Sequence, residues 1–128
     1  MTISKEKIKS LKELEVIVND LRNHGSIIVT TNGIFDILHV GHIRYLQEAK
    51  KLGDILIAAV NSDASTKKLK GNSRPINNEN DRAEVIAALE CVDFITIFHE
   101  DNPIKILSVL KPNIHVKAGD YKLSQIIE

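Results

Sequence analysis

The sequence is poor in the residues that build disulfides, zinc clusters and base-stacking surfaces. Its 128 residues include one cysteine and no tryptophan, and only 4% are aromatic. Cys91 alone can form neither an intrachain disulfide nor a thiolate zinc cluster, so we expect it to pack in the core as a small apolar side chain. Without disulfides to protect, the default expectation is a reducing, cytoplasmic compartment.

The chain also lacks an excess of charge and a long apolar run. Lys plus Arg and Asp plus Glu are both 17, so the formal net charge is zero. No apolar run approaches the roughly 18 residues that cross a bilayer. We therefore expect neither nucleic acid nor a membrane as a partner, and any anion site must be local. The phosphate-loop motif and the G-x-G-x-x-G fingerprint are missing too, which argues against kinase-type nucleotide binding and dinucleotide-dependent oxidoreduction.

What is present is an alternation of apolar strands and amphipathic helices. With 43% apolar and 27% charged residues, the chain fits a single domain over residues 1–128. Helices are predicted from residue 11 to a stop at Gly25, after a Ser10/Glu13 capping box, and at 41–52, 64–69, 78–89 and 104–110; strands are predicted at 26–31, 54–60, 93–98 and 114–117. The pattern predicts an α/β fold, a Rossmann-like three-layer sandwich with a mainly parallel sheet of four to five strands. Ligands of such sheets bind beyond the carboxyl ends of the strands.

The segment 32–42, between the first strand and the next helix, has the features of a phosphate-binding loop. Gly33 permits a tight turn or a positive φ, and Gly41 lets a ligand approach the backbone. The helix that follows offers unpaired N–H groups and a positive dipole end. His39 and His42 are three residues apart, so both imidazoles can donate hydrogen bonds to phosphate oxygens on the same side.

A histidine pair has other common explanations. Such residues are often solvated or packed in a core, or they bind zinc. Zinc is disfavoured because no cysteine or carboxylate at ligand spacing completes a tetrahedral set. His42, Leu46 and Ala49 have helical spacing, which places His42 on the buried stripe at the sheet rim. The remaining histidines have no matching partners in the sequence and are interpreted as structural: His24, His99 and His115.

Basic side chains follow the second strand and enter the fourth predicted helix. Arg82, Ile86 and Leu89 share one helical face, which sets a guanidinium on an apolar stripe where it needs a partner. That partner is either a nearby carboxylate or a ligand phosphate bound bidentately. The cluster Lys67, Lys68 and Lys70 would be an ordinary solvated face, except that it lies next to the predicted phosphate loop.

Three aspartates border the predicted rim. Asp120 follows the last strand and either accepts from a base amine, a ribose hydroxyl or hydrated magnesium, or caps a helix. Asp36 is expected to cap or brace the 32–42 segment. Asp63 is expected to cap the short helix after it.

The pattern Gly33-x-Phe35-Asp36-x-x-His39-x-Gly41-His42 resembles the signature of the nucleotidyltransferase superfamily, the cytidylyltransferase-like group with its HxGH motif. More narrowly, residues 31–71, 74–98 and 111–121 look like the adenylyltransferase domain of ADP-heptose synthases. This resemblance implies transfer of AMP from ATP, with Mg²⁺, to a sugar 1-phosphate such as heptose 1-phosphate, in the making of lipopolysaccharide precursors. Family habit also implies a homodimer.

The resemblance implies roles for matching positions. The residues implied in catalysis are His39, His42, Lys70 and Arg82, and those implied in nucleotide binding are Thr31, Gly33, Ile34, Phe35, Gly41 and Asp120. Two departures look tolerable: Ile34 stands where Cys or Thr is frequent, and Ala118 where Gly is usual. The family also continues into a further strand and a Ser/Thr-rich motif that close the triphosphate site, and we expect the domain to lack both. A truncated sequence, a wall supplied by a partner chain and weak activity are the alternatives.

The expected reaction is in-line attack by a sugar phosphate oxygen on the α-phosphorus of ATP, with pyrophosphate leaving. No Ser or Cys stands beside a base, and the attacking phosphate is already ionised, so neither a covalent intermediate nor a general base is required. One alternative is CTP with glycerol 3-phosphate in the same fold. Another is a nucleotide-binding domain with little catalysis, and a third, a pure scaffold, would show no nucleotide affinity.

Overall fold

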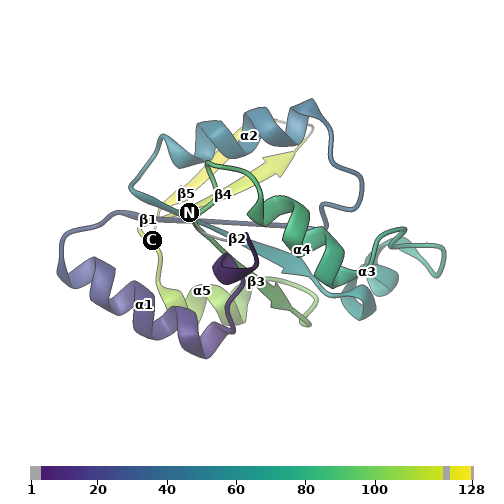
Figure 1. Cartoon of the computed structure of the whole chain (residues 1–128), viewed down its shortest axis with the longest axis horizontal. Coiled ribbons are helices and arrows are strands. Elements are labelled where there is room, and N and C mark those ends of the chain that lie inside the picture. The colour runs from purple at the N-terminus through teal and green to yellow at the C-terminus, as the bar shows by residue number, and fades with distance from the viewer. Residues whose placement is uncertain (1–3, 120–121, 128) are drawn as a thin grey trace.

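The computed structural model describes residues 4–119 and 122–127, which form one sheet covered by helices on both faces (Figure 1). Within these residues the sheet has five strands in the order β3-β2-β1-β4-β5. They are β1 (Ile28–Gly33), β2 (Ile55–Asn61), β3 (Phe94–Phe98), β4 (Ile114–Gly119) and β5 (Lys122–Ile127). The first four are parallel, and β5 runs antiparallel to β4. The α/β class and the mainly parallel sheet are therefore confirmed.

The helices form the two outer layers. They are the 3₁₀ turn η1 (Ser4–Lys7) and the helices α1 (Leu11–Asn23), α2 (Val40–Lys50), α3 (Asp63–Lys70), α4 (Glu79–Ala87) and α5 (Ile104–Leu110). Figure 1 shows α1 beside α5 on one side of the sheet and α2 on the other. None of the helices in the described ranges combines the length and the apolar character needed to cross a bilayer.

Two apolar cores follow from the alternation of side chains along each strand. Val29 packs on one face of β1, in the cluster beneath α2 and α4, whereas Ile28 packs on the other, beneath α1 and α5. Both side chains are fully buried. A strand buried on both faces must be apolar at nearly every position, which is why the strands appear in the sequence as short continuous apolar runs.

Helix starts were predicted well because capping residues act locally. The Ser10 hydroxyl accepts from the Glu13 N–H at 3.1 Å, and the Glu13 carboxylate accepts from the Ser10 N–H at 3.0 Å, which is the predicted capping box. The expectation for Asp63 was wrong: Ser62 caps α3 by accepting from the Ser65 N–H at 3.2 Å. Asp63 is instead bound by the Arg82 guanidinium.

The strand order places a topological switch at β1. Its neighbours are β2 on one side and β4 on the other; the crossover from β1 to β2 runs through α2 on one face, and the crossover from β3 to β4 runs through α5 on the other. In open parallel sheets the crevice beyond the carboxyl ends of such strands is the usual ligand site. The β1–α2 loop, the end of β2 and helix α3 border this crevice.

Candidate functional site

A cleft of about 830 Å³ opens at the carboxyl ends of β1 and β2. The β1–α2 loop, the end of β2, helix α3 and the loop before α4 form its walls. It brings together six residues that the sequence assigned to the site: Gly33, Ile34, Phe35, His39, His42 and Lys70. Of the three loops expected to share one rim, after Thr31, Val60 and Lys117, the first two meet in this cleft, and the third includes residues outside the described ranges.

His39 and His42 form a mutually bonded pair at the start of α2. The Nδ1 atom of His39 accepts from the Gly41 N–H at 3.0 Å, and the Nδ1 atom of His42 accepts from the His39 N–H at 3.1 Å. These bonds cap the helix, with His39 as the N-cap residue. Because Nδ1 is the acceptor in both rings, the proton of each neutral imidazole is on Nε2. The ring centroids lie 4.2 Å apart.

The electrostatics of the pair favour a neutral imidazole at His42. Burial lowers the pKa of His42 below its ordinary value of 6.5, and a positive charge on His39 lowers it further. Protonation of His42 would also place a hydrogen on Nδ1, where the His39 N–H is already donated. Each ring can therefore donate a hydrogen bond through Nε2, at the positive end of the α2 dipole.

The sequence predicted that Gly33 would permit a tight turn in the β1–α2 loop. In the structure Phe35 makes this turn instead. Phe35 has φ of 51°, in the left-handed region that bulky residues rarely adopt, whereas Gly33 keeps an ordinary φ. The glycine is required for space: a Cβ at position 33 would lie 2.9 Å from the Phe35 ring. That ring is nearly buried and packs edge-on to His42 with centroids 6.0 Å apart.

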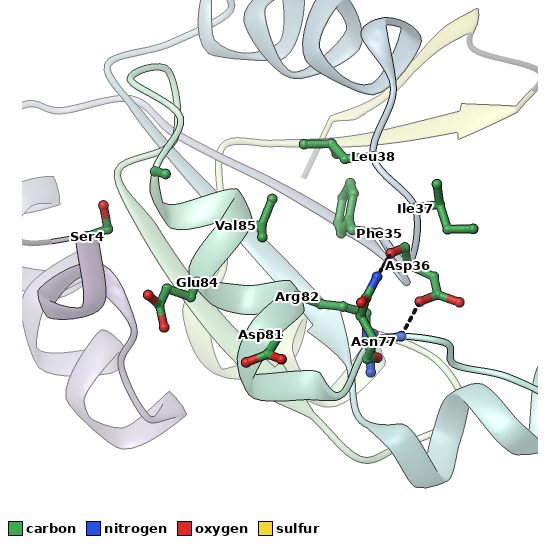
Figure 2. A pocket seen from close by; sticks show the side chains of 11 residues that line it. Ser4, Phe35, Asp36, Ile37, Leu38, Asn77, Asp81, Arg82, Glu84 and Val85 are labelled. Atoms are coloured by element: carbon green, nitrogen blue, oxygen red, sulfur yellow. Dashed lines mark hydrogen bonds between the residues drawn. The ribbon is translucent and has the colours of Figure 1, made fainter.

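Asp36 braces this loop against the segment before α4, as predicted. Its carboxylate accepts from the N–H groups of Ile76 and Asn77 at 2.9 Å each and from the Arg74 guanidinium at 3.2 Å. Figure 2 shows Asp36 facing Asn77 across the gap between the two segments. Burial alone would raise the pKa of Asp36, but the hydrogen bonds from Asn77 and Ile76 and the charge of Arg74 outweigh it and hold the pKa below its ordinary value.

Arg82 is buried at the junction of these segments, with 1% of its surface exposed. Its Nη1 donates to the carbonyls of Ile34 at 2.7 Å and Asn61 at 2.8 Å, and its Nε donates to the carbonyl of Asn77 at 2.9 Å. Its Nη2 binds the Asp63 carboxylate at 2.9 Å. Of the two partners considered from the sequence, the carboxylate is the one present. The guanidinium joins the β1–α2 loop, the end of β2 and the 71–78 segment, and a direct role in catalysis stays a prediction.

The other four predicted site residues differ in where they lie. The Thr31 hydroxyl donates to the Val116 carbonyl at 2.9 Å and contacts the Tyr45 hydroxyl, so it is buried beneath the cleft. The Gly41 N–H is already bonded to His39. Lys70, at the end of α3, lines the cleft and is exposed. Asp120 lies outside the described residues, so its predicted role is untested.

Several polar residues that line the cleft were not singled out from the sequence. They are Asn32, Asn61, Thr66 and Arg74. A usable signal existed for two of them. Asn32 and Asn61 each end a buried apolar strand, and polar side chains at carboxyl ends of parallel strands lie at the ligand-binding edge.

A second cleft, of about 640 Å³, lies behind the β1–α2 loop against α4 (Figure 2). Phe35, Asp36 and Ile37 form a wall common to both clefts. Its floor is apolar, with Leu38 and Val85, and Asp81 and Glu84 stand at its rim. Among the described residues that line it, Arg82 is the one basic side chain and is fully engaged, so this cleft does not resemble a phosphate site.

The described residues contain no group of three or more His, Cys, Asp or Glu side chains placed to hold a metal ion. In the main cleft, Asp36 is bound by Arg74 and backbone amides, and Asp101 pairs with Lys68 at 3.5 Å. Because these carboxylates are already engaged, the site fits a magnesium ion coordinated by nucleotide phosphates and water better than an ion coordinated mainly by protein side chains.

This fold and this cleft define a nucleotidyltransferase. Residues 30–126 match the family described as cytidylyltransferase-like, and the chain belongs to that family. The match spans the β1–α2 loop, the histidine pair, most of β1 and the whole of β2, β3 and β4.

Among individual proteins, the chain is similar to several named "Bifunctional protein HldE". It is 54% identical to that of Nitratiruptor sp. over 97% of its length and 56% identical to that of Helicobacter pylori over 89%. It spans only 27% and 25% of these two relatives. A crystal structure titled as the lipopolysaccharide core biosynthesis protein from Thermoplasma volcanium superposes with a TM-score of 0.65 at 45% identity, covering 71% of this chain and 73% of that one.

Proposed function

We propose that the chain transfers AMP from ATP to a sugar 1-phosphate, with heptose 1-phosphate as the first candidate, giving an ADP-sugar and pyrophosphate. The observation that carries this proposal is the histidine pair: two imidazoles with their protons on Nε2, at the start of α2, in a cleft that also contains Lys70. Similarity to proteins named for lipopolysaccharide core biosynthesis and to bifunctional HldE proteins supports the choice of sugar.

In the proposed reaction, an oxygen of the sugar phosphate attacks the α-phosphorus of ATP in line, and the bond from that phosphorus to the bridging oxygen breaks. Pyrophosphate leaves with the bonding electrons. His39 and His42 donate hydrogen bonds to phosphate oxygens as their charge grows, and Lys70 adds a mobile positive charge. Mg²⁺ bound to ATP would supply charge neutralisation on the phosphates.

The chain's own contribution to this reaction is positioning. Arg82 and Asp36 tie the β1–α2 loop to the end of β2 and to the 71–78 segment, so the imidazoles are held on a braced support. No proton needs to be removed from the attacking phosphate, which is ionised at neutral pH. Side chains that only donate hydrogen bonds are therefore sufficient.

Pyrophosphate release tests the proposal directly. The chain is incubated with Mg²⁺ and either ATP or CTP, and with either heptose 1-phosphate or glycerol 3-phosphate. ATP with heptose 1-phosphate should give turnover, and the nucleotide product should have the mass of an ADP-sugar. Release only with CTP and glycerol 3-phosphate would reject the proposed substrates, and nucleotide binding without release from any acceptor would reject catalysis.

A further inference from the structure

Two asparagines near the carboxyl ends of neighbouring strands line the main cleft: Asn32 is the next-to-last residue of β1, and Asn61 is the last residue of β2. Side chains alternate along strands, and Ile28 and Ile57 both belong to the core beneath α1 and α5. Asn32 and Asn61 follow these residues at even spacing, so both lie on that face of the sheet. Because Asn32 is in register with Ala59, strand spacing and rise put the two asparagine Cα atoms roughly 8 Å apart.

The Asn32 amide is oriented by a chain of buried polar groups. The Thr30 hydroxyl lies 2.8 Å from Nδ1 of His115, and Nε2 of His115 lies 3.0 Å from Oδ1 of Asn32. Within the described part of the chain, Nδ1 is the one acceptor that the buried Thr30 hydroxyl reaches, so the hydroxyl donates to it. The His115 ring then carries its proton on Nε2 and donates it to Oδ1. Asn32 is left with its NH₂ group for the cleft.

The Asn61 amide has the opposite orientation. The Ser65 hydroxyl donates to the Ser62 carbonyl at 3.2 Å, so toward Asn61 its oxygen can only accept. It accepts from Nδ2 of Asn61 at 3.3 Å. Among the described residues, none donates to Oδ1 of Asn61, although only 4% of the residue is exposed. Asn61 therefore presents an acceptor to the cleft.

We propose that Asn32 and Asn61, the amide pair, bind two hydroxyl groups of a sugar ring. A hydroxyl both donates and accepts, so it satisfies an NH₂ group and a carbonyl oxygen together. A phosphate only accepts, and the Asn61 carbonyl would repel it. The inference rests on the proposed function, which supplies two sources of such hydroxyls: the acceptor sugar and the ribose of ATP. His115 is a positioning residue that acts through Asn32.

Calorimetry on the full chain distinguishes the acceptor sugar from the ribose of ATP as the source of the hydroxyl groups. Heptose 1-phosphate, ATP, 2′,3′-dideoxy-ATP and inorganic phosphate are titrated into the wild type, Asn32→Ala, Asn61→Ala and the control Asn80→Ala, which changes an exposed α4 residue. We expect each cleft variant to weaken heptose 1-phosphate binding about fivefold to tenfold and to leave inorganic phosphate unchanged. A loss for ATP that disappears with the dideoxy nucleotide would support the pair and assign it to the ribose.

Other outcomes overturn the inference. They are equal losses of affinity for sugar phosphate and inorganic phosphate, or no loss of affinity for any ligand.

If Asn32→Ala does not fold, Asn32→Asp keeps the shape and the acceptor for His115, and the binding of heptose 1-phosphate should then weaken more than that of inorganic phosphate. His115→Gln, which keeps a donor to Asn32, should bind sugar phosphate better than His115→Leu. A wild type that binds heptose 1-phosphate through the pair but releases no pyrophosphate would reject AMP transfer and leave the amide pair standing.

Discussion

The backbone N–H of His39 donates to Nδ1 of His42 across 3.1 Å, so the second imidazole of the motif satisfies the backbone of the first histidine and keeps its own proton on Nε2. This single bond gives His42 two separable tasks. One is to close the helix start, through Nδ1, and the other is to donate to phosphate, through Nε2. Substitutions that mimic one nitrogen at a time distinguish them.

His42→Asn retains an acceptor near the position of Nδ1 and loses the donor. We expect a folded protein whose turnover falls roughly a hundredfold to a thousandfold, with a smaller change in ATP affinity, because donors to developing charge matter most in the transition state. His42→Gln, which places an NH₂ group near Nε2, should keep more turnover. Pyrophosphate-release kinetics measure both, with the exposed His99→Asn as the control. Wild-type turnover in His42→Asn would contradict the assignment.

The pH dependence of stability follows from the lowered pKa of His42. Its folded pKa lies below the unfolded value of 6.5, so below that pH the unfolded chain binds more protons than the folded one. This contribution to stability is complete above pH 6.5 and is lost as the pH falls toward the folded pKa. Urea unfolding of the wild type and His42→Asn between pH 5 and 8 should therefore show a steeper acid-side loss in the wild type. Parallel curves would show that His42 titrates normally.

The sequence predicted most of the fold and part of the site, and the division has physical reasons. The stripe of His42, Leu46 and Ala49 and the apolar run of β2 depend on periodicity, which any single sequence displays. β5 was not predicted because Lys122–Ile127 is short and mixes polar and apolar residues without clear alternation. A carboxylate partner for Arg82 was one of the alternatives considered, but its other three partners were not predicted because they are backbone carbonyls, which every residue carries.

Arg82 should matter more for stability than its salt bridge alone indicates. Arg82→Met would leave the Ile34 and Asn61 carbonyls and the Asp63 carboxylate without their donor, and removing one partner of a buried ion pair costs about 3–5 kcal/mol. Asp63→Asn keeps an acceptor at a partly exposed position and should cost about 1 kcal/mol. Chemical denaturation compares the two. Equal losses would mean that the ion pair, and not the carbonyl contacts, dominates.

Asp36 links the β1–α2 loop to the 71–78 segment, and the stability that this link contributes depends on pH. Its folded pKa lies below the unfolded value of 3.8, so its contribution is present above that pH and is lost as the pH falls through the folded pKa. Asp36→Asn should lower stability by about 1–3 kcal/mol near neutral pH, because charge-assisted bonds to Ile76 and Asn77 become neutral ones. Guanidinium unfolding from pH 2.5 to 7 should show the two curves converging in acid. A difference in unfolding free energy that stays constant with pH would show that the ionisation of Asp36 does not cause the loss.

Gly33 and Gly25 are glycines for different reasons: Gly33 lacks space for a side chain, and Gly25 has a positive φ. A Cβ at Gly33 would meet the Phe35 ring at 2.9 Å, and that ring is held by its own left-handed backbone and by the Asp36 contacts behind it. Gly33→Ala should therefore cost about 1–3 kcal/mol and displace Phe35 from His42, lowering turnover as well. At Gly25 nothing lies within 4 Å but φ is 89°, so Gly25→Ala should cost about 1 kcal/mol of stability and leave turnover unchanged. Thermal melts and pyrophosphate-release rates measured on both variants check this contrast, and unchanged turnover in Gly33→Ala would show that the Phe35 ring does not position His42.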